Sequence, residues 1–187
     1  MVTAAGDLIQ VAWGVIAVVW VVMAFRTKRT VARSGGVARL AVIYVIAVIV
    51  LTRPMEHTSL HHHIWKPSSA VSVVAVILVV AGAAFALWAR LTIGRNWSGV
   101  VTLKQDHELM QSGPYHFARH PIYTGLLTMG LGSALQYDEP FSFILLAVVI
   151  VMLVFKIRLE EKLMTESFPD DYPQYRRRVK AIVPYIL

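Results

Sequence analysis

The sequence contains no cysteine and has few charged residues. Without cysteine, a disulfide-stabilised scaffold, a cysteine-ligated zinc site and a thiol nucleophile are all excluded. Charged residues make up only 16% of the 187 positions, against about 25% in soluble domains. Acidic residues are scarcer than basic ones, with 11 Asp and Glu against 18 Lys and Arg, which gives a net charge of +7.

Apolar residues are what the sequence has in excess. They account for 57% of the chain, and the mean hydropathy is +0.60. An intrinsically disordered chain would be poor in such residues. The composition therefore indicates an integral membrane protein.

Five uncharged apolar runs are candidate membrane spans. A helix of about 20 residues crosses the hydrocarbon core, so the first and third runs are long enough and the other three are short. Only residues 138–140 separate the last two, which predicts a tight helical hairpin with a helix-starting proline. We expect an all-α membrane protein of about five transmembrane helices, without a Rossmann domain. The runs are Leu8–Phe25, Leu40–Thr52, Ala70–Ala89, Ile122–Tyr137 and Phe141–Phe155.

The distribution of basic residues predicts the topology. With five spans, 16 of the 18 Lys and Arg fall on one side, and only Arg53 and Lys66 fall on the other. The positive-inside rule then places the N-terminus outside and the C-terminus in the cytoplasm. Because the retention of Lys and Arg on the cytoplasmic side explains the positive net charge, a nucleic-acid partner is not needed to explain it. No basic region precedes the first run, so we expect a retained span rather than a cleaved signal peptide.

The cytoplasmic stretch before the fourth run is dense in polar groups. Gly113-Pro114 marks a turn, and Pro121 suits the first turn of a helix. The helix start, flanked by Arg119 and His120, is an arrangement that binds anions. The alternative is that these two side chains only anchor the helix at the lipid headgroups. If the hairpin brings its ends together, Glu160 or Glu161 lies near Arg119 and His120.

Three other features have simpler interpretations. His57 and His61–His63 form a histidine cluster with one acidic neighbour, and we predict no metal site there. The glycines of Gly130-Leu131-Gly132 lie inside a span with no preceding strand, so helix packing is favoured over dinucleotide binding. The basic aromatic segment 172–180 is expected to form an interfacial helix on anionic headgroups.

Several motifs in the C-terminal half resemble the isoprenylcysteine carboxyl methyltransferase family. The resemblance begins at Gly94, and the related phospholipid N-methyltransferases share the Arg-His-Pro and Glu-Glu elements. It suggests one membrane domain, residues 1–187, with N-terminal spans in 1–93 and a cofactor-binding half in 94–187. The motifs are Ser112-Gly113-Pro114-Tyr115, Arg119-His120-Pro121-Ile122-Tyr123-Thr124-Gly125, Arg158-Leu159-Glu160-Glu161, Phe168-Pro169-Asp170-Asp171-Tyr172 and Val183-Pro184.

The resemblance implies a methyltransferase that uses S-adenosyl-L-methionine, with the site on the cytoplasmic side. By position, it implies catalytic roles for Arg119 and Arg158 and substrate contact by Arg158 or Lys156. It also implies a set of cofactor-binding residues, namely Lys104, His107, Leu109, Met110, Tyr115, His120, Pro121, Ile122, Tyr123, Glu160 and Glu161.

The favoured hypothesis is carboxyl O-methylation of an isoprenylcysteine-type acceptor, either a lipophilic small molecule or a prenylated substrate, that enters from the bilayer. One alternative is a phospholipid N-methyltransferase. Another is an NADPH-dependent membrane reductase of the sterol type. A non-enzymatic channel is disfavoured because the spans lack ionisable residues to line a path. The expected location is a prokaryotic inner membrane, with membrane lipids as partners.

Overall fold

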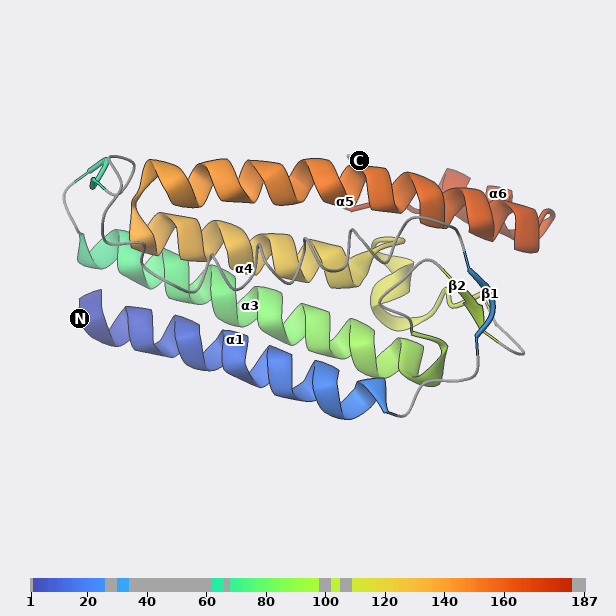
Figure 1. Cartoon of the computed structure of the whole chain (residues 1–187), viewed down its shortest axis with the longest axis horizontal. Coiled ribbons are helices and arrows are strands. Elements are labelled where there is room, and N and C mark those ends of the chain that lie inside the picture. Colours follow the sequence, from blue (N-terminus) through green and yellow to red (C-terminus); the bar gives the residue numbers. More distant parts are fainter. Residues whose placement is uncertain are drawn as a thin grey trace.

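The computed structural model describes residues 2–25, 30–33, 62–65, 68–97, 102–104 and 109–182. Four long helices lie side by side along the long axis of the molecule (Figure 1). The short helix α6 packs near the C-terminal end of α5, and two 3-10 turns, η1 and η2, precede α4. The elements are α1 Val2–Ala24, α3 Ser69–Ile93, η1 Gly94–Asn96, η2 Gly113–His116, α4 Pro121–Tyr137, α5 Pro140–Ser167 and α6 Asp171–Arg178.

Three of the described helices are long and apolar enough to cross a membrane. The qualifying segments are Thr3–Ala24, Ser69–Asn96 and Pro140–Ser167. Helix α4, with 17 residues, is shorter, and the predicted second span lies outside the described residues. The predicted membrane protein built of helices is therefore confirmed, while the count of five spans stays a prediction.

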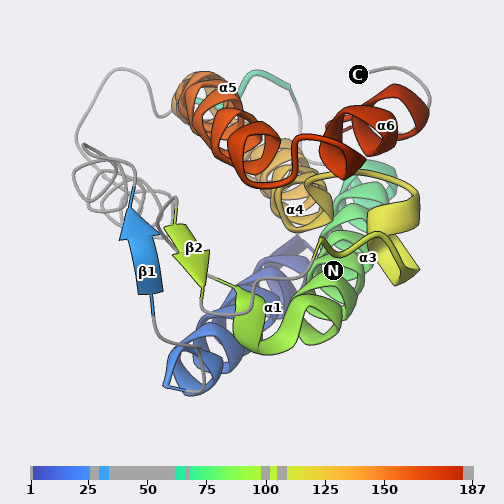
Figure 2. The same ribbon diagram turned by 90° about the vertical axis from the view of Figure 1, so that its right-hand side faces the viewer.

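A small β ribbon departs from the all-α expectation. Strand β1, Thr30–Arg33, pairs antiparallel with β2, Thr102–Lys104. Figure 2 shows the ribbon beside the bundle, near the ends of α1 and α3 that precede its strands. Both segments follow helices that end at this end of the bundle, and both contain the β-branched residues that favour strands. Two such segments brought side by side satisfy their backbone groups by pairing with each other.

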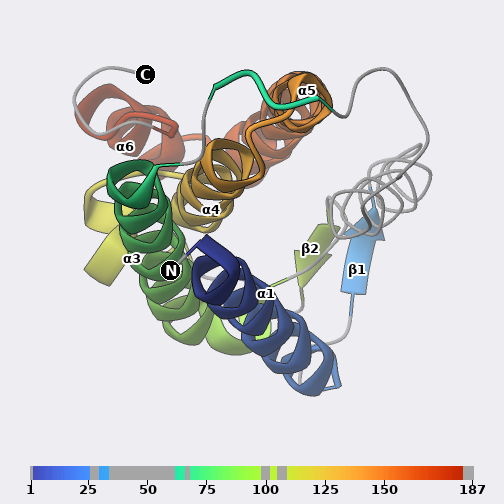
Figure 3. The ribbon, with the colours of Figure 1, turned by 90° about the vertical axis from the view of Figure 1, so that its left-hand side faces the viewer.

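The predicted hairpin of α4 and α5 is confirmed. Asp138 ends α4 in the left-handed conformation, with φ 60°, and Pro140 begins α5 two residues later. The Asp138 carboxylate accepts a hydrogen bond from the backbone N–H of Trp65 at 3.1 Å. The backbone carbonyl of Asp138 accepts another from the backbone N–H of Ile64. Residues 62–65 thus lie against the hairpin turn (Figure 3). His63 Nδ1 lies 3.5 Å from the same carboxylate.

Helix α5 is longer than the apolar run that predicted it. The run ends at Phe155, but the helix continues to Ser167 without a glycine or proline to stop it. Two pairs at i, i+4 spacing, Lys156–Glu160 at 4.0 Å and Lys162–Glu166 at 3.9 Å, accompany the extension. The extension carries charged side chains beyond the end of the apolar run.

Small residues let α4 approach its neighbours closely, as predicted. A Cβ atom on Gly125 would lie 2.6 Å from the Gly82 carbonyl oxygen of α3, and one on Gly132 would lie 2.6 Å from the Ala75 carbonyl oxygen. Ser133 accepts a hydrogen bond from Trp13 of α1 at 3.0 Å. This contact between helix backbones fixes the position of α4, whose first turn carries the site described below.

Gly125→Ala is expected to destabilise the bundle. The new methyl group would meet the Gly82 carbonyl and the Ala86 backbone nitrogen, neither of which can move without shifting a helix. Overpacking of this kind costs about 1–3 kcal/mol, so the thermal unfolding temperature in detergent should fall. Gly14→Ala in α1 is the control, because nothing lies within 4 Å of its Cβ position. Equal unfolding temperatures for the two variants would contradict the close α3–α4 contact.

Candidate functional site

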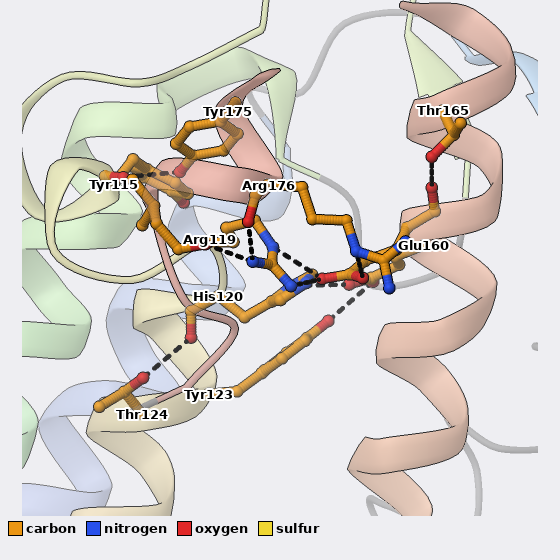
Figure 4. A network of polar contacts seen from close by, with 11 residues as sticks. Tyr115, Arg119, His120, Tyr123, Thr124, Glu160, Thr165, Tyr175 and Arg176 are labelled. Atoms are coloured by element: carbon orange, nitrogen blue, oxygen red, sulfur yellow. Dashed lines mark hydrogen bonds and ion pairs between the residues drawn. The ribbon is translucent and has the colours of Figure 1, made fainter. Parts of the chain in front are cut away.

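The first turn of α4 and the C-terminal part of α5 bring four ionisable side chains together. Arg119 and His120 precede α4, and Glu160 and Glu161 lie on α5. Figure 4 shows Arg119 and His120 pointing toward α5, with Tyr123 aimed at Glu160. The predicted meeting of the two ends of the hairpin is confirmed.

Glu160 is held by three groups that favour its charged form. Tyr123 donates its hydroxyl to Oε1 at 2.7 Å, His120 Nδ1 lies 3.4 Å from Oε2, and Lys156 Nζ lies 4.0 Å from Oε1. The His120 and Tyr123 rings are stacked, with centroids 5.6 Å apart and planes 7° apart. The Lys156 ammonium lies 5.2 Å from the Tyr123 ring centroid. The result is a carboxylate beside two parallel aromatic faces.

Glu161 is more deeply buried and more tightly paired. Arg119 donates to its Oε1 through Nε at 2.8 Å and through Nη2 at 2.5 Å. Arg176 of α6 lies 3.4 Å from Oε2, and His120 Nε2 lies 3.4 Å from Oε1. Only 9% of the Glu161 side chain and 8% of the Arg119 side chain are exposed. Such a pair is stable only while both partners are present.

The segment after α6 covers the start of α4. The backbone N–H groups of Arg119 and His120 donate to the carbonyls of Lys180 and Ala181 at 2.8 and 2.9 Å, and Arg119 Nη1 donates to the Val179 carbonyl. Thr124 donates its hydroxyl to the Ile182 carbonyl at 2.7 Å. These chain carbonyls and the two glutamates are the negatively charged and electron-rich groups that face the helix start in the structure. Binding of an anionic ligand there stays a prediction.

Two tyrosines support this arrangement from the side of η2. Tyr175 of α6 donates its hydroxyl to the Tyr115 carbonyl at 2.6 Å. Burial raises the pKa of the Tyr115 and Tyr175 hydroxyls above their ordinary values, so both stay neutral donors. Leu109 packs against Tyr175, and Met110 packs against Tyr115. The segment before η2 is thereby joined to α6.

His120 is poised to carry a positive charge. Burial by itself lowers the pKa of the imidazole, but hydrogen bonds and charges from Glu160 and Glu161 outweigh burial and raise the pKa above its ordinary value. The other titratable groups that contact the imidazole or its two carboxylates are Arg119, Tyr123, Lys156 and Arg176. The two carboxylates therefore favour the charged form of the imidazole between them.

The raised pKa of His120 predicts a pH-dependent contribution to stability. A group whose pKa is higher in the folded state stabilises fully below its unfolded pKa, about 6.5, and this contribution is lost as pH rises through the folded pKa. The unfolding temperature of the wild type should exceed that of His120→Gln at pH 6, and the difference should shrink by pH 9. A difference that stays constant over this range would contradict the charged imidazole.

The structure gathers most of the predicted site residues and separates a few. Leu109, Met110 and Tyr115 lie at the edge of the cluster, and Lys104 lies in β2. His107 lies outside the described residues, as do His57 and His61. The residues at the centre, or buried in the first turn of α4 beside it, are Arg119, His120, Pro121, Ile122, Tyr123, Lys156, Glu160 and Glu161.

The two candidates for substrate contact lie in different surroundings. Lys156 lies within the Glu160 and Tyr123 cluster. Arg158 is exposed and lines a separate groove with Lys162 and Arg176. Residues two positions apart on a helix do not share a face, so one helix cannot present both side chains to the same centre.

Sequence reasoning missed the roles of Arg176 and Tyr175 at the site. Both were assigned to a basic aromatic helix on the membrane surface, and Arg176 instead contacts Glu161 while Tyr175 binds Tyr115. The signal was present as two tyrosines three positions apart in α6, followed by a run of three arginines. An amphipathic helix of that pattern packs its tyrosines inward, and both Tyr172 and Tyr175 are only 3% exposed.

Comparison with known proteins identifies the family. The profile of the isoprenylcysteine carboxyl methyltransferase (ICMT) family matches residues 75–166, about half of the chain. The protein-S-isoprenylcysteine O-methyltransferase of Saccharomyces cerevisiae is 31% identical over 118 residues, covering 62% of this chain and 49% of the yeast protein. Protein-S-isoprenylcysteine O-methyltransferase B of Arabidopsis thaliana is 27% identical over 150 residues, covering 79% and 71%. The Homo sapiens enzyme of the same name is 30% identical over 125 residues, covering 65% and 44%.

The matched region carries most of the site. It includes α4 and the Glu160–Glu161 pair, and the chain spans about half the length of the yeast and human relatives. The motifs and the comparisons agree, and the chain belongs to the isoprenylcysteine carboxyl methyltransferase family.

Proposed function

We propose that this chain is an S-adenosyl-L-methionine-dependent methyltransferase that methylates the carboxylate of a lipophilic acceptor of the isoprenylcysteine type. The observation that carries the proposal is the overlap of the family match with the buried cluster of His120, Tyr123 and Glu160. The relatives are named for O-methylation of protein-S-isoprenylcysteine. Their names give no support to a phospholipid amine acceptor or to a nicotinamide-dependent reduction.

The residues of the cluster fit the proposed cofactor. Its amino group and ribose hydroxyls need a carboxylate, and its sulfonium is stabilised by aromatic faces. Glu160 supplies the carboxylate, with 20% of its side chain exposed, and the neutral ring of Tyr123 supplies the aromatic face. His120 Nε2 is buried and lies 3.4 Å from Glu161 Oε1, so Glu161 holds this side of the imidazole in place. When bound, the cofactor supplies the electrophilic methyl group.

The remaining work of the protein is to align the acceptor and exclude water. An ionised carboxylate acceptor is already nucleophilic, so no general base is required. Arg119 has its donors directed at Glu161 and at the carbonyls of Arg176 and Val179. We therefore assign Arg119 a positioning role, and we assign acceptor orientation to Lys156, the cation beside Glu160.

The proposal includes the placement of the protein in its membrane. The acceptor would reach the cluster from the bilayer, and the site would lie at the cytoplasmic face of a prokaryotic inner membrane, with the N-terminus outside. Residues 94–187 would hold the cofactor, and residues 1–93 would supply the N-terminal spans. The excess of basic residues at the site end supports this orientation.

A binding comparison in detergent tests the proposed function. S-adenosylhomocysteine should raise the thermal unfolding temperature of the purified protein, and NADPH should not. In membranes, labelled S-adenosyl-L-methionine should then transfer its methyl group to N-acetyl-S-farnesylcysteine in base-labile form, as expected for an ester. Stabilisation by NADPH alone would overturn the proposal, and base-stable product in the phospholipid fraction would favour an amine acceptor.

A further inference from the structure

A second polar feature lies beside the cluster, on the outer face of α5. A groove of about 330 Å³ is formed between α5 and α6. Figure 2 shows the two helices side by side at the edge of the bundle. The groove is lined by Arg158, Glu161, Lys162, Thr165, Glu166 and Arg176.

The charges of the groove leave an excess of cations. Glu161 is already paired with Arg119 and with Arg176. Glu166 pairs with Lys162 at 3.9 Å, in an exposed pair of the weak i, i+4 type. Arg158 is exposed and forms no ion pair with any described residue. The groove therefore has a guanidinium without a counterion, with a second guanidinium and an ammonium lining the same space.

An exposed apolar stripe on α5 runs into this groove. Ile144, Val148, Val151 and Phe155 are each between 46% and 56% exposed. Their spacing of four, three and four residues places them along one face of the helix, and Arg158 and Lys162 continue that spacing. From Ile144 to Phe155 the helix rises about 16 Å, close to the thickness of one hydrocarbon leaflet.

This arrangement matches the shape of a phospholipid in one leaflet. An acyl chain would lie along the stripe, and a headgroup phosphate would meet Arg158 where the stripe ends. We propose that the groove between α5 and α6 binds the phosphate of an anionic membrane phospholipid through Arg158, Lys162 and Arg176. The site adjoins the proposed methyl-transfer centre and shares Glu161 and Arg176 with it, but Arg158 lies on a different face of α5 from Lys156.

The proposed site has a direct connection to the cluster. Arg176 lines the groove and also lies 3.4 Å from Glu161. A phosphate in the groove would share Arg176 with Glu161 and so help hold α6 against α5. An anionic lipid would therefore stabilise the end of the bundle that carries the cluster.

Lipid retention by the purified protein tests the proposal without cofactor or acceptor. Native mass spectrometry would compare phosphatidylglycerol with phosphatidylcholine of equal chain length, each added to delipidated protein in detergent. The wild type should prefer phosphatidylglycerol, and Arg158→Gln should lower its binding about fivefold, the effect of one basic residue near a headgroup. Arg158→Lys should retain most of the preference. Arg177→Gln is the matched control, because it removes one charge from α6 outside the groove lining.

Each outcome bears on the proposal. Equal losses in Arg158→Gln and Arg177→Gln would overturn it in favour of diffuse attraction to the basic helix. Displacement of the lipid by equimolar inorganic phosphate would overturn it in favour of a soluble anion. Unfolding temperatures of the variants, measured without lipid, separate loss of binding from loss of fold. Failure of this test leaves the methyltransferase proposal untouched, because neither cofactor nor methyl transfer enters the measurement.

Discussion

Glu160→Gln is expected to weaken binding of S-adenosylhomocysteine by about 10- to 100-fold, because hydrogen bonds to a charged group contribute about 1.5–3 kcal/mol. Glutamine keeps the size of the side chain but removes the charge that His120 and Lys156 face. It also replaces one acceptor oxygen by a donor, which is unsuited to the amino group of the cofactor. Isothermal titration calorimetry in detergent would measure the loss.

A control on the same helix separates this effect from a general loss of negative charge. Glu139→Gln removes one carboxylate at the opposite end of α5, next to the hairpin turn. This variant should bind S-adenosylhomocysteine like the wild type. Wild-type affinity in Glu160→Gln would show that the carboxylate does not contact the cofactor. Loss of affinity in both variants would assign the effect to α5 as a whole.

Tyr123→Phe refines the same measurement. The phenol donates to Glu160 at 2.7 Å, and its ring stacks on His120. Phenylalanine keeps the stacked ring and removes only the hydrogen bond, so a smaller loss than in Glu160→Gln is expected. The two variants together separate the contribution of the Tyr123 hydrogen bond from that of the Glu160 charge.

The centre of this site could be predicted because the hairpin is short. Once residues 138–140 join two antiparallel helices, the start of one and the end of the other must lie at the same end of the bundle. Arg119 and His120 therefore face Glu160 and Glu161 for a topological reason. The family resemblance named the same residues, and its assignment of cofactor contacts stays a prediction.

Other contacts had no signal in the sequence pattern. The carbonyls of Lys180 and Ala181 bind backbone N–H groups at the start of α4, and backbone groups are alike in every residue. The ribbon of β1 and β2 joins segments about 70 positions apart, and strands of four and three residues are too short for an alternating pattern to identify them. The apolar run also ended at Phe155, twelve residues before the helix does. Charged side chains on an exposed helix surface have the same low hydropathy as a loop, so hydropathy alone does not detect this part of the helix.

The separation of Lys156 from Arg158 could have been predicted from the helix period. Lys156 and Glu160 are four residues apart and share a face, whereas Arg158 is turned about 200° away from Lys156. The structure places Lys156 beside Glu160 and Arg158 in the outer groove, as that period requires.

Arg119→Met is expected to lower the free energy of unfolding by about 3–5 kcal/mol, the cost of leaving one member of a buried ion pair without its partner. Glu161 keeps Arg176 and His120 nearby, at 3.4 Å each, but loses both of its shortest contacts. The variant also loses the Nη1 contacts with the carbonyls of Arg176 and Val179, which hold α6 against α4. Reversible unfolding in mixed detergent micelles would measure the change.

A double variant separates the stranded charge from the lost packing. In Arg119→Met with Glu161→Leu, no carboxylate remains to be left unpaired, and apolar replacements of buried pairs are often neutral or stabilising. The double variant should therefore recover part of the stability lost in Arg119→Met. If it is less stable than Arg119→Met, the contacts of Glu161 with Arg176 and His120 outweigh the cost of losing its strongest partner. If it recovers stability but fails to bind S-adenosylhomocysteine, the pair is kept for positioning the cofactor site, at the expense of a more stable apolar contact.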